Sequence, residues 1–222
     1  MKSAQSPLGT TPSLGTSPSL APWLQPGRLE AGCDEAGRGC LAGPVVAAAV
    51  ILEGEVALDL ACKQVLNDSK QMPEALRDAL RMEIESRALA WAVAFIDPEE
   101  IDRINILQAS FAAMRNAVRS LNPVPEHLLI DGNRFVTERD LPPHTCLVRG
   151  DARFASIAAA SVLAKTHRDA YMRDADRDHP GYGWAQNMGY PTAAHRQAIR
   201  TLGLTPLHRV TFRQLPETPK LF

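Results

Sequence analysis

The stretch AGCDEAGRGCLAGPVV, residues 31–46, most constrains what this chain can fold into. It places two adjacent acids, Asp34 and Glu35, within a run of apolar and small residues that is typical of a buried strand. Burying a carboxylate in such a strand is costly unless a cation or hydrogen bonds compensate its charge. Gly37, Arg38 and Gly39, here called the glycine turn, follow directly and predict a tight turn with exposed backbone N–H and C=O groups. Taken alone, the turn is better explained as a simple hairpin turn, and it gains weight only beside the acid pair.

The length of 222 residues suits one domain with a tail, and 45% hydrophobic residues are enough for a core. The formal net charge of −1 indicates no particular partner. Residues 149–213, however, contain 10 Lys or Arg and 5 Asp or Glu, a local excess of +5. This basic third of the chain fits either a polyanion-binding face or ordinary solvated helix surfaces.

The cysteines and the apolar runs indicate the compartment. Four cysteines occur without CxxC spacing, and none pairs with a histidine at zinc-ligand spacing. No signal peptide is recognisable, and no apolar run reaches the roughly 20 residues that cross a bilayer. We therefore expect reduced thiols, a soluble cytoplasmic protein and no membrane contact.

Composition divides the chain into three parts. Residues 1–27 are rich in Ser, Thr, Pro and Gly and contain no acid, which predicts a disordered extension. Residues 28–215 carry the periodic patterns of a folded catalytic domain, including a helical C-terminal part. Residues 216–222 are expected to form a flexible tail.

Hydrophobic periodicity predicts an α/β fold with one mixed sheet. Alternating or apolar runs predict strands at 29–34, 43–52, 89–96, 127–132 and 144–151. A helix is expected after Pro73, and a longer one after Asp97 with a break near Asn105. Residues 155–178 predict a helix whose first half is nearly all small residues, so that it can lie close to the sheet. A short helix is expected at 193–202.

Acidic residues stand at or beside three predicted strand ends: the pair Asp34 and Glu35, then Asp131, then Asp151. If these strands are neighbours, the four carboxylates converge and repel one another unless a cation lies between them. Oxygen ligands without Cys or His favour Mg²⁺ or Mn²⁺ over zinc. A helix cap or a surface turn remains the simpler explanation for Asp131 and Asp151 individually. The buried pair is harder to explain in that way.

At this point the motifs resemble a known family. DEAGRG with GPVVAAAV, then NDSK, NILQAS, LLIDGN, GDARFASIAAASVLAKTHRD, MGYPTAAH and LHRVTF occur in the order found in bacterial ribonuclease HII, the type 2 ribonuclease H. The resemblance runs from about residue 29 to residue 212. It implies a ribonuclease H-like fold, with a mixed five-stranded sheet flanked by helices and a small helical C-terminal part. It also implies an endonuclease that cleaves the RNA strand of RNA–DNA hybrids and nicks 5′ to single ribonucleotides in duplex DNA.

The resemblance also implies roles for individual residues. Asp34, Glu35, Asp131 and Asp151 match the catalytic carboxylates that hold two Mn²⁺ or Mg²⁺ ions. Gly37, Arg38 and Gly39 match the motif whose backbone senses the ribose 2′-OH, and Tyr190 matches the tyrosine that stacks on the following sugar. Lys70 and Lys165 match positions expected near phosphates. Such an enzyme leaves 5′-phosphate and 3′-hydroxyl ends and removes ribonucleotides in replication and repair.

Rival functions are distinguishable by their residues. A Holliday-junction resolvase or type 1 ribonuclease H would lack the adjacent acid pair and the tyrosine motif. A non-catalytic nucleic-acid-binding module on the same fold would be favoured by the loss of a carboxylate, and all four are present. We expect a monomer. The terminal QLPETPKLF only faintly resembles a sliding-clamp-binding peptide, and its spacing differs, so a frayed tail is the preferred interpretation.

Overall fold

The computed structural model describes residues 20–62 and 73–215. The strands are β1 (Glu30–Ala36), β2 (Val45–Ile51), β3 (Ala90–Ile96), β4 (His127–Asp131) and β5 (His144–Leu147). The helices are α1 (Gly54–Cys62), α2 (Glu74–Arg87), α3 (Pro98–Ile104), α4 (Ile106–Arg119), the 3₁₀ turn η2 (Gly150–Ala152), α5 (Ala155–Asp178), α6 (Trp184–Asn187) and α7 (Ala193–Leu202).

The strands form one five-stranded sheet in the order β3-β2-β1-β4-β5. β2 pairs antiparallel with both β1 and β3, whereas β4 pairs parallel with both β1 and β5. The sheet is therefore mixed, as the sequence predicts. The parallel strands place the carboxyl ends of β1, β4 and β5 along one edge, where loops can present functional groups.

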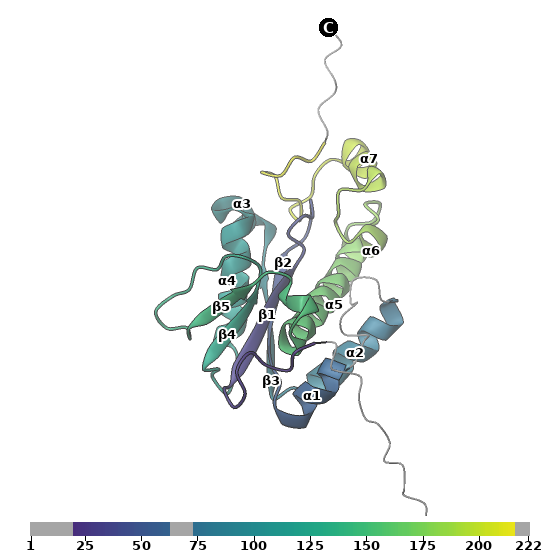
Figure 1. Cartoon of the computed structure of the whole chain (residues 1–222). Helices are drawn as coiled ribbons and strands as arrows, with labels where there is room; N and C mark the ends of the chain where they lie inside the picture. Colours follow the sequence, from purple (N-terminus) through teal and green to yellow (C-terminus); the bar gives the residue numbers. More distant parts are fainter. Residues whose placement is uncertain (1–19, 63–72, 216–222) are drawn as a thin grey trace, which may run out of the picture.

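Alternation along β2 explains why helices cover both faces of the sheet (Figure 1). Ala48 and Val50 point into a core shared with α1, α2 and α5. Ala47, Ala49 and Ile51 point into the opposite core, shared with α4. Because successive strand residues face opposite sides, an unbroken apolar strand is expected when both faces are buried.

The small-residue half of α5 lies directly against β1, as its composition predicts. A Cβ placed on Gly32 of β1 would lie 2.2 Å from the backbone carbon of Ser156, so only glycine fits at this crossing. Ala158, Ala159 and Ala160 are essentially fully buried in the same core. The close approach brings the next turns of α5 beside the carboxyl end of β1.

The predicted break in the long helix occurs at Asn105, which separates α3 from α4. Asn105 has a φ of 68°, and its side-chain oxygen accepts hydrogen bonds from the backbone N–H groups of Leu107 and Gln108. Asparagine tolerates this left-handed conformation better than most residues and caps the new helix. The sequence reasoning did not predict α1, which follows β2 directly.

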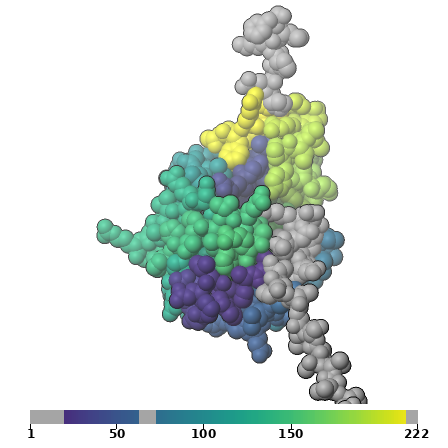
Figure 2. Space-filling view, in the orientation of Figure 1, coloured from purple at the N-terminus to yellow at the C-terminus, as the bar shows by residue number. Residues whose placement is uncertain are grey.

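The C-terminal part packs on α5 as a smaller unit with its own core (Figures 1 and 2). Tyr182 and Trp184 stack with their ring centroids 4.9 Å apart, and Met172 and Ile199 pack around them. Ala42, just after the glycine turn, pairs antiparallel with His208 as an isolated bridge. The C-terminal part therefore contacts the turn between β1 and β2.

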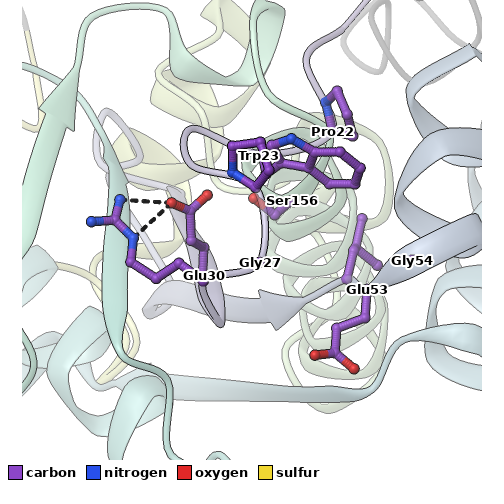
Figure 3. A pocket seen from close by; sticks show the side chains of 10 residues that line it. Pro22, Trp23, Gly27, Glu30, Glu53, Gly54 and Ser156 are labelled. Carbon is purple, nitrogen blue, oxygen red and sulfur yellow. Dashed lines mark hydrogen bonds and ion pairs between the residues drawn. The ribbon is translucent and has the colours of Figure 1, made fainter.

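Residues 20–27 were assigned to the extension, but they pack on the domain. Leu20 is buried and donates its N–H to the Ala61 carbonyl at 3.2 Å. The buried Glu30 carboxylate accepts hydrogen bonds from the backbone N–H groups of Leu24 and Gln25, and pairs with Arg28 at 2.7 Å. Figure 3 shows this ion pair beside Trp23. A single acid on β1 thus fixes a loop that composition alone assigns to the extension.

The remaining residues of the extension, and the tail at 216–222, lie outside the described residues. Across residues 20–62 and 73–215, no helix is both long and apolar enough to span a bilayer.

Candidate active site

The strand register brings two of the predicted acids together. In the parallel pairing of β1 with β4, Cys33 lies opposite Ile130. Continuing this register by one residue places Asp34 beside Asp131 at the carboxyl edge of the sheet. Since alternate residues face opposite sides, Cys33 points into the core shared with α4, whereas Asp34 faces away from that core.

A cavity of about 340 Å³ opens at this edge. Side chains from β1, β4 and α5 line it together with the glycine turn and Tyr190. Its lining residues are Asp34, Glu35, Ala36, Gly37, Arg38, Gly39, Asp131, Ser161, Lys165 and Tyr190. Eight of the ten predicted site residues therefore share one cavity: Asp34, Glu35, Gly37, Arg38, Gly39, Asp131, Lys165 and Tyr190.

Burial and like charge act together on the acid pair. Asp34 is 5% exposed, and burial raises the pKa of its carboxyl well above the ordinary value; the nearby Glu35 and Asp131 carboxylates raise it further. Burial also raises the pKa of Glu35, although its ion pair with Arg38 at 3.0 Å opposes that shift. Hydrogen bonds from Ser161 and from the Glu35 N–H, the latter at 2.7 Å, stabilise the charged form of Asp34 without cancelling the effect of burial. The pair is therefore poorly compensated by the protein itself.

Asp131 and Asp151 lie on neighbouring elements. The Asp131 carboxylate accepts a hydrogen bond from the Gly150 N–H at 2.7 Å, and Asp151 is the next residue, within η2. Asp151 does not line the cavity that contains the other three acids. Within the part of the chain that the structure describes, no three His, Cys, Asp or Glu side chains are grouped so that they could hold a metal ion. The structure thus brings three of the four predicted acids to one cavity and places the fourth beside it.

The donor chemistry fits a hard divalent cation. Every acidic side chain of the cavity offers carboxylate oxygens, which Mg²⁺ and Mn²⁺ prefer, and the lining contains neither His nor Cys. A bound cation would also lower the cost of holding Asp34, Glu35 and Asp131 as neighbouring charges. The donor types present therefore fit the predicted ions, although the side chains are not grouped as a formed metal site, and metal binding by them stays a prediction.

The two glycines of the glycine turn have different surroundings. Gly37 has a φ of 92°, and a Cβ placed on it would lie 2.0 Å from Nε of the buried Arg168. Gly39 has no atom within 4 Å of such a Cβ, so it faces open space. Only Gly37 is thus required by the fold itself. Gly39 leaves room for a ligand to approach the backbone closely.

Lys165 and Tyr190 line the same cavity as the acids. Lys165, on α5, is bound to the buried Asp169 carboxylate at 2.6 and 2.8 Å. Tyr190 is 40% exposed, and burial of the rest of the ring raises the pKa of its hydroxyl. A partly exposed aromatic ring beside a cavity can stack on a sugar or base. Lys70, the remaining predicted residue, lies outside the described residues.

Sequence reasoning did not single out Ser161, which lines the cavity and hydrogen-bonds Asp34. Its signal was its spacing: Ser161 lies four residues before Lys165, so both face the same side of α5. A smaller hollow of about 140 Å³ extends from Glu35 and Asp131 toward α4, and Asn133 and Arg134, in the loop after β4, also line it. The acids therefore lie between two adjoining hollows.

A buried hydrogen-bond network, also absent from the sequence reasoning, supports the Tyr190 loop. His195 donates from Nδ1 to the Tyr190 carbonyl at 2.9 Å, and its Nε2 accepts from Trp184 Nε1 at 2.9 Å. His208 Nε2 lies 3.3 Å from the same His195 nitrogen, while His208 Nδ1 accepts from the Thr205 N–H at 2.9 Å. Burial lowers the pKa of both histidines, that of His208 to about 4. Both rings are therefore neutral at physiological pH.

Comparison with known proteins agrees with this geometry. The family model described as Ribonuclease HII matches residues 31–215. The chain is 58% identical to a ribonuclease HII of Parabacteroides distasonis over 89% of this chain and 96% of the relative. It is 57% identical to a ribonuclease HII of Phocaeicola vulgatus over 91% of this chain and 98% of the relative.

Solved structures share the fold. The ribonuclease H2 of Pyrococcus horikoshii superposes with a TM-score of 0.71 at 23% identity, over 83% of this chain and 94% of that one. The ribonuclease HII of Archaeoglobus fulgidus, solved as a complex with PCNA, gives a TM-score of 0.69 at 24% identity, over 87% and 100% of the two chains. A Bst ribonuclease HIII in complex with Mn²⁺ gives 0.62 at 21% identity, over 84% and 68%. At these identities the likeness concerns the fold.

Proposed function

The chain belongs to the ribonuclease HII family, whose members are endonucleases, and from that premise we propose its substrate and mechanism. The protein hydrolyses the RNA strand of RNA–DNA hybrids and nicks duplex DNA 5′ to a single embedded ribonucleotide. It leaves 5′-phosphate and 3′-hydroxyl ends. This activity removes ribonucleotides in replication and repair.

One observation carries the proposal: Asp34, Glu35 and Asp131 share a cavity with the glycine turn and Tyr190. Carboxylates beside a backbone turn fit a phosphodiester whose neighbouring ribose needs to be recognised. The 2′-OH distinguishes RNA from DNA, and backbone N–H and C=O groups can bind it without reading the base. The open space at Gly39 allows that approach.

The residues of this chain hold the ions and orient the strand. Asp34, Glu35, Asp131 and Asp151 would bind two Mg²⁺ or Mn²⁺ ions. When bound, such ions activate water for attack and stabilise the leaving 3′-oxygen. By holding such ions, the carboxylates would orient the scissile phosphate relative to the attacking water. The Mn²⁺ complex of a ribonuclease HIII with the same fold is consistent with this choice of ion.

Substrate contacts surround the acids. Tyr190 stacks on the sugar that follows the ribonucleotide, because its ring is the partly exposed aromatic surface of the cavity. Lys165 lies near a phosphate; its ion pair with Asp169 holds the ammonium at the cavity wall. Lys70 is proposed to contact phosphate on resemblance alone. No base-specific contact is needed for this recognition.

The protein acts as a monomer in this proposal. An archaeal ribonuclease HII was solved with PCNA, but the QLPETPKLF segment of this chain departs from the spacing of a clamp-binding peptide. We therefore propose no clamp contact for its activity. A cytoplasmic location stays an expectation from the sequence.

The decisive experiment is cleavage of a DNA duplex with one ribonucleotide, in Mg²⁺ or Mn²⁺, beside an all-DNA duplex. A single nick 5′ to the ribonucleotide, abolished by EDTA and by Asp131→Asn, is the expected result. Asp140→Asn is the matched control, because Asp140 pairs with Arg119 on the loop after β4, away from the cavity. Cleavage of long hybrids alone would contradict the roles of the glycine turn and Tyr190. Binding without cleavage would favour a non-catalytic module.

A further inference from the structure

The segment around Arg209 is joined to the chain that follows the glycine turn. The Gly43 N–H donates to the Leu207 carbonyl, and the Arg209 N–H donates to the Leu41 carbonyl, both at 2.8 Å. Together with the pairing of Ala42 and His208, these bonds make a short antiparallel ladder. In Figure 2 the yellow C-terminal segment lies beside the purple-blue chain near the turn. The ladder fixes the backbone of Arg209 and therefore the point from which its side chain extends.

The Arg209 guanidinium is fully buried and directed at backbone carbonyls. Nη1 donates to the Arg38 carbonyl at 3.0 Å, while Nε and Nη2 donate to the Gly43 carbonyl at 3.0 and 2.8 Å. Its carbon lies 5.1 Å from the centre of the Phe212 ring. Burial lowers the pKa of Arg209 to about 10, so the group stays charged at neutral pH. A planar fork is needed to reach both carbonyls at once.

A second buried guanidinium supports the same stretch from α5. Arg168 donates to the carbonyls of Ala42 at 3.0 Å, Pro44 at 2.9 Å and Met188 at 2.8 Å. The Ala42 and Pro44 carbonyls follow the glycine turn and Met188 is the C-cap of α6, whereas the Arg38 carbonyl, within the turn, is held by Arg209. Burying a guanidinium is costly. We therefore expect the bond from Arg209 to the Arg38 carbonyl to serve the site as well as the packing.

We propose that Arg209 is a positioning residue for recognition of the ribose 2′-OH. By holding the Arg38 carbonyl, it sets the plane of the peptide between Arg38 and Gly39, two residues that line the cavity. A backbone group recognises a hydroxyl only when its peptide plane has one orientation, because hydrogen bonds weaken steeply with angle. This inference rests on the proposed function, since it assigns a cause to the 2′-OH selectivity of that site.

The test measures selectivity separately from overall binding. Two labelled duplexes, identical except for one ribonucleotide, are titrated with protein in Ca²⁺, and the ratio of their Kd values is recorded. Arg209→Lys keeps the charge but loses the fork. We expect it to lower the preference for the ribonucleotide duplex about tenfold, and to change the affinity for the all-DNA duplex less than about twofold. Phe212→Leu, which loosens the guanidinium, should lower the preference less.

Arg196→Lys is the matched control, because Arg196 also donates to carbonyls of the C-terminal segment, those of Arg213 and Gln214, but not to the glycine turn. It should leave the ratio unchanged. Equal weakening of both duplexes by Arg209→Lys and Phe212→Leu would show a general structural role and overturn the proposal, as would an unchanged ratio in both variants. The ratio does not depend on the folded fraction, and Phe212→Leu decides the outcome if Arg209→Lys fails to fold. A wild-type protein without any preference would contradict the proposed function instead.

Discussion

Two acids, Asp34 and Glu35, precede the glycine turn, and two buried arginines, Arg168 and Arg209, hold the backbone around it. The protein compensates the charge of the arginines but not that of the acids. Asp34 is buried and Glu35 is partly buried near the Asp131 carboxylate, and the raised pKa of each indicates that the fold disfavours its charged form. Arg168 and Arg209 are buried as deeply, yet each donates to several backbone carbonyls. Such a difference indicates that one region is arranged to attract a ligand and the other to hold backbone still.

Removing one acid should affect the first region most. Asp34→Asn is expected to lower cleavage at least about 10²–10³-fold, a typical loss for a group that stabilises the transition state. The same change should raise the Tm of the metal-free protein, because it removes a buried charge with a raised pKa. Cleavage assays and thermal melts with and without Mn²⁺ measure both effects. Mn²⁺ should raise the Tm of the wild type more than that of the variant.

A Tm that falls in the metal-free variant would contradict this comparison, because Asp34 would then stabilise the fold. Asp140→Asn, on an exposed loop, serves again as the control.

The two glycines of the glycine turn distinguish fold from ligand approach. Gly37→Ala should lower the free energy of unfolding by about 3 kcal/mol, since it combines a left-handed φ with a clash against Arg168. Gly39→Ala should leave the unfolding free energy nearly unchanged and weaken only substrate binding. Urea unfolding of both variants measures the difference. Equal destabilisation by the two substitutions would show that the open space at Gly39 does not exist.

Truncating Tyr190 tests the aromatic side chain that lines the cavity. Tyr190→Ala should weaken binding of the ribonucleotide duplex by about 1–3 kcal/mol, the usual contribution of a stacked aromatic ring. Tyr190→Phe should retain most of the affinity, because the ring remains. Titrations in Ca²⁺ compare the two variants with the wild type. Loss of affinity in Tyr190→Phe equal to that in Tyr190→Ala would indicate that the hydroxyl, not the ring, makes the contact.

Acid should destabilise the histidine network. The folded pKa of His208, about 4, lies below the ordinary value of 6.5, so the unfolded chain binds more protons between these values. Stability due to this group is therefore complete above pH 6.5 and is lost as the pH falls toward 4, by at most about 1.4 kcal/mol per pH unit. Urea unfolding from pH 7 to pH 5 measures the slope. Asp34, whose pKa is raised, contributes a slope of opposite sign, because its stability is lost as the pH rises above the ordinary value of 3.8 toward the folded pKa.

His208→Asn should reduce the acid slope, and His144→Gln is the control because His144 lies outside the network, on β5. An unchanged slope in His208→Asn would assign the acid sensitivity to other groups.

Much of the fold followed from periodicity, and the reasons are local. The strands, the break at Asn105 and the close approach of α5 depend on alternation, capping and small residues, all of which neighbouring residues determine. Asp34 and Asp131 were expected to converge because each ends a strand, and the register of β1 and β4 confirms it. Helix α1 was not predicted, since its nine residues carry no strong start signal.

The residues that support the site could not be predicted from the sequence, for a different reason. Arg168 and Arg209 are charged, so composition places them at the surface, and all but one of their carbonyl partners lie more than 120 residues away along the chain. His195 and His208 form their network only once α7 and the C-terminal segment pack together. Ser161 was hidden within a run of small residues. Composition alone places residues 20–27 in the extension, because the residue that binds their backbone, Glu30, belongs to β1 and lies outside that segment.

Helix α5 has a mechanical consequence. Its 24 residues span about 36 Å, with one half packed on the sheet and the other within the core of the C-terminal part. A single continuous helix resists bending. We therefore expect the acids on the sheet and the Tyr190 loop, which pack on its two halves, to keep a constant separation. Any adjustment of shape on binding is therefore expected from side chains and from the duplex, and not from closure of one part of the protein onto the other.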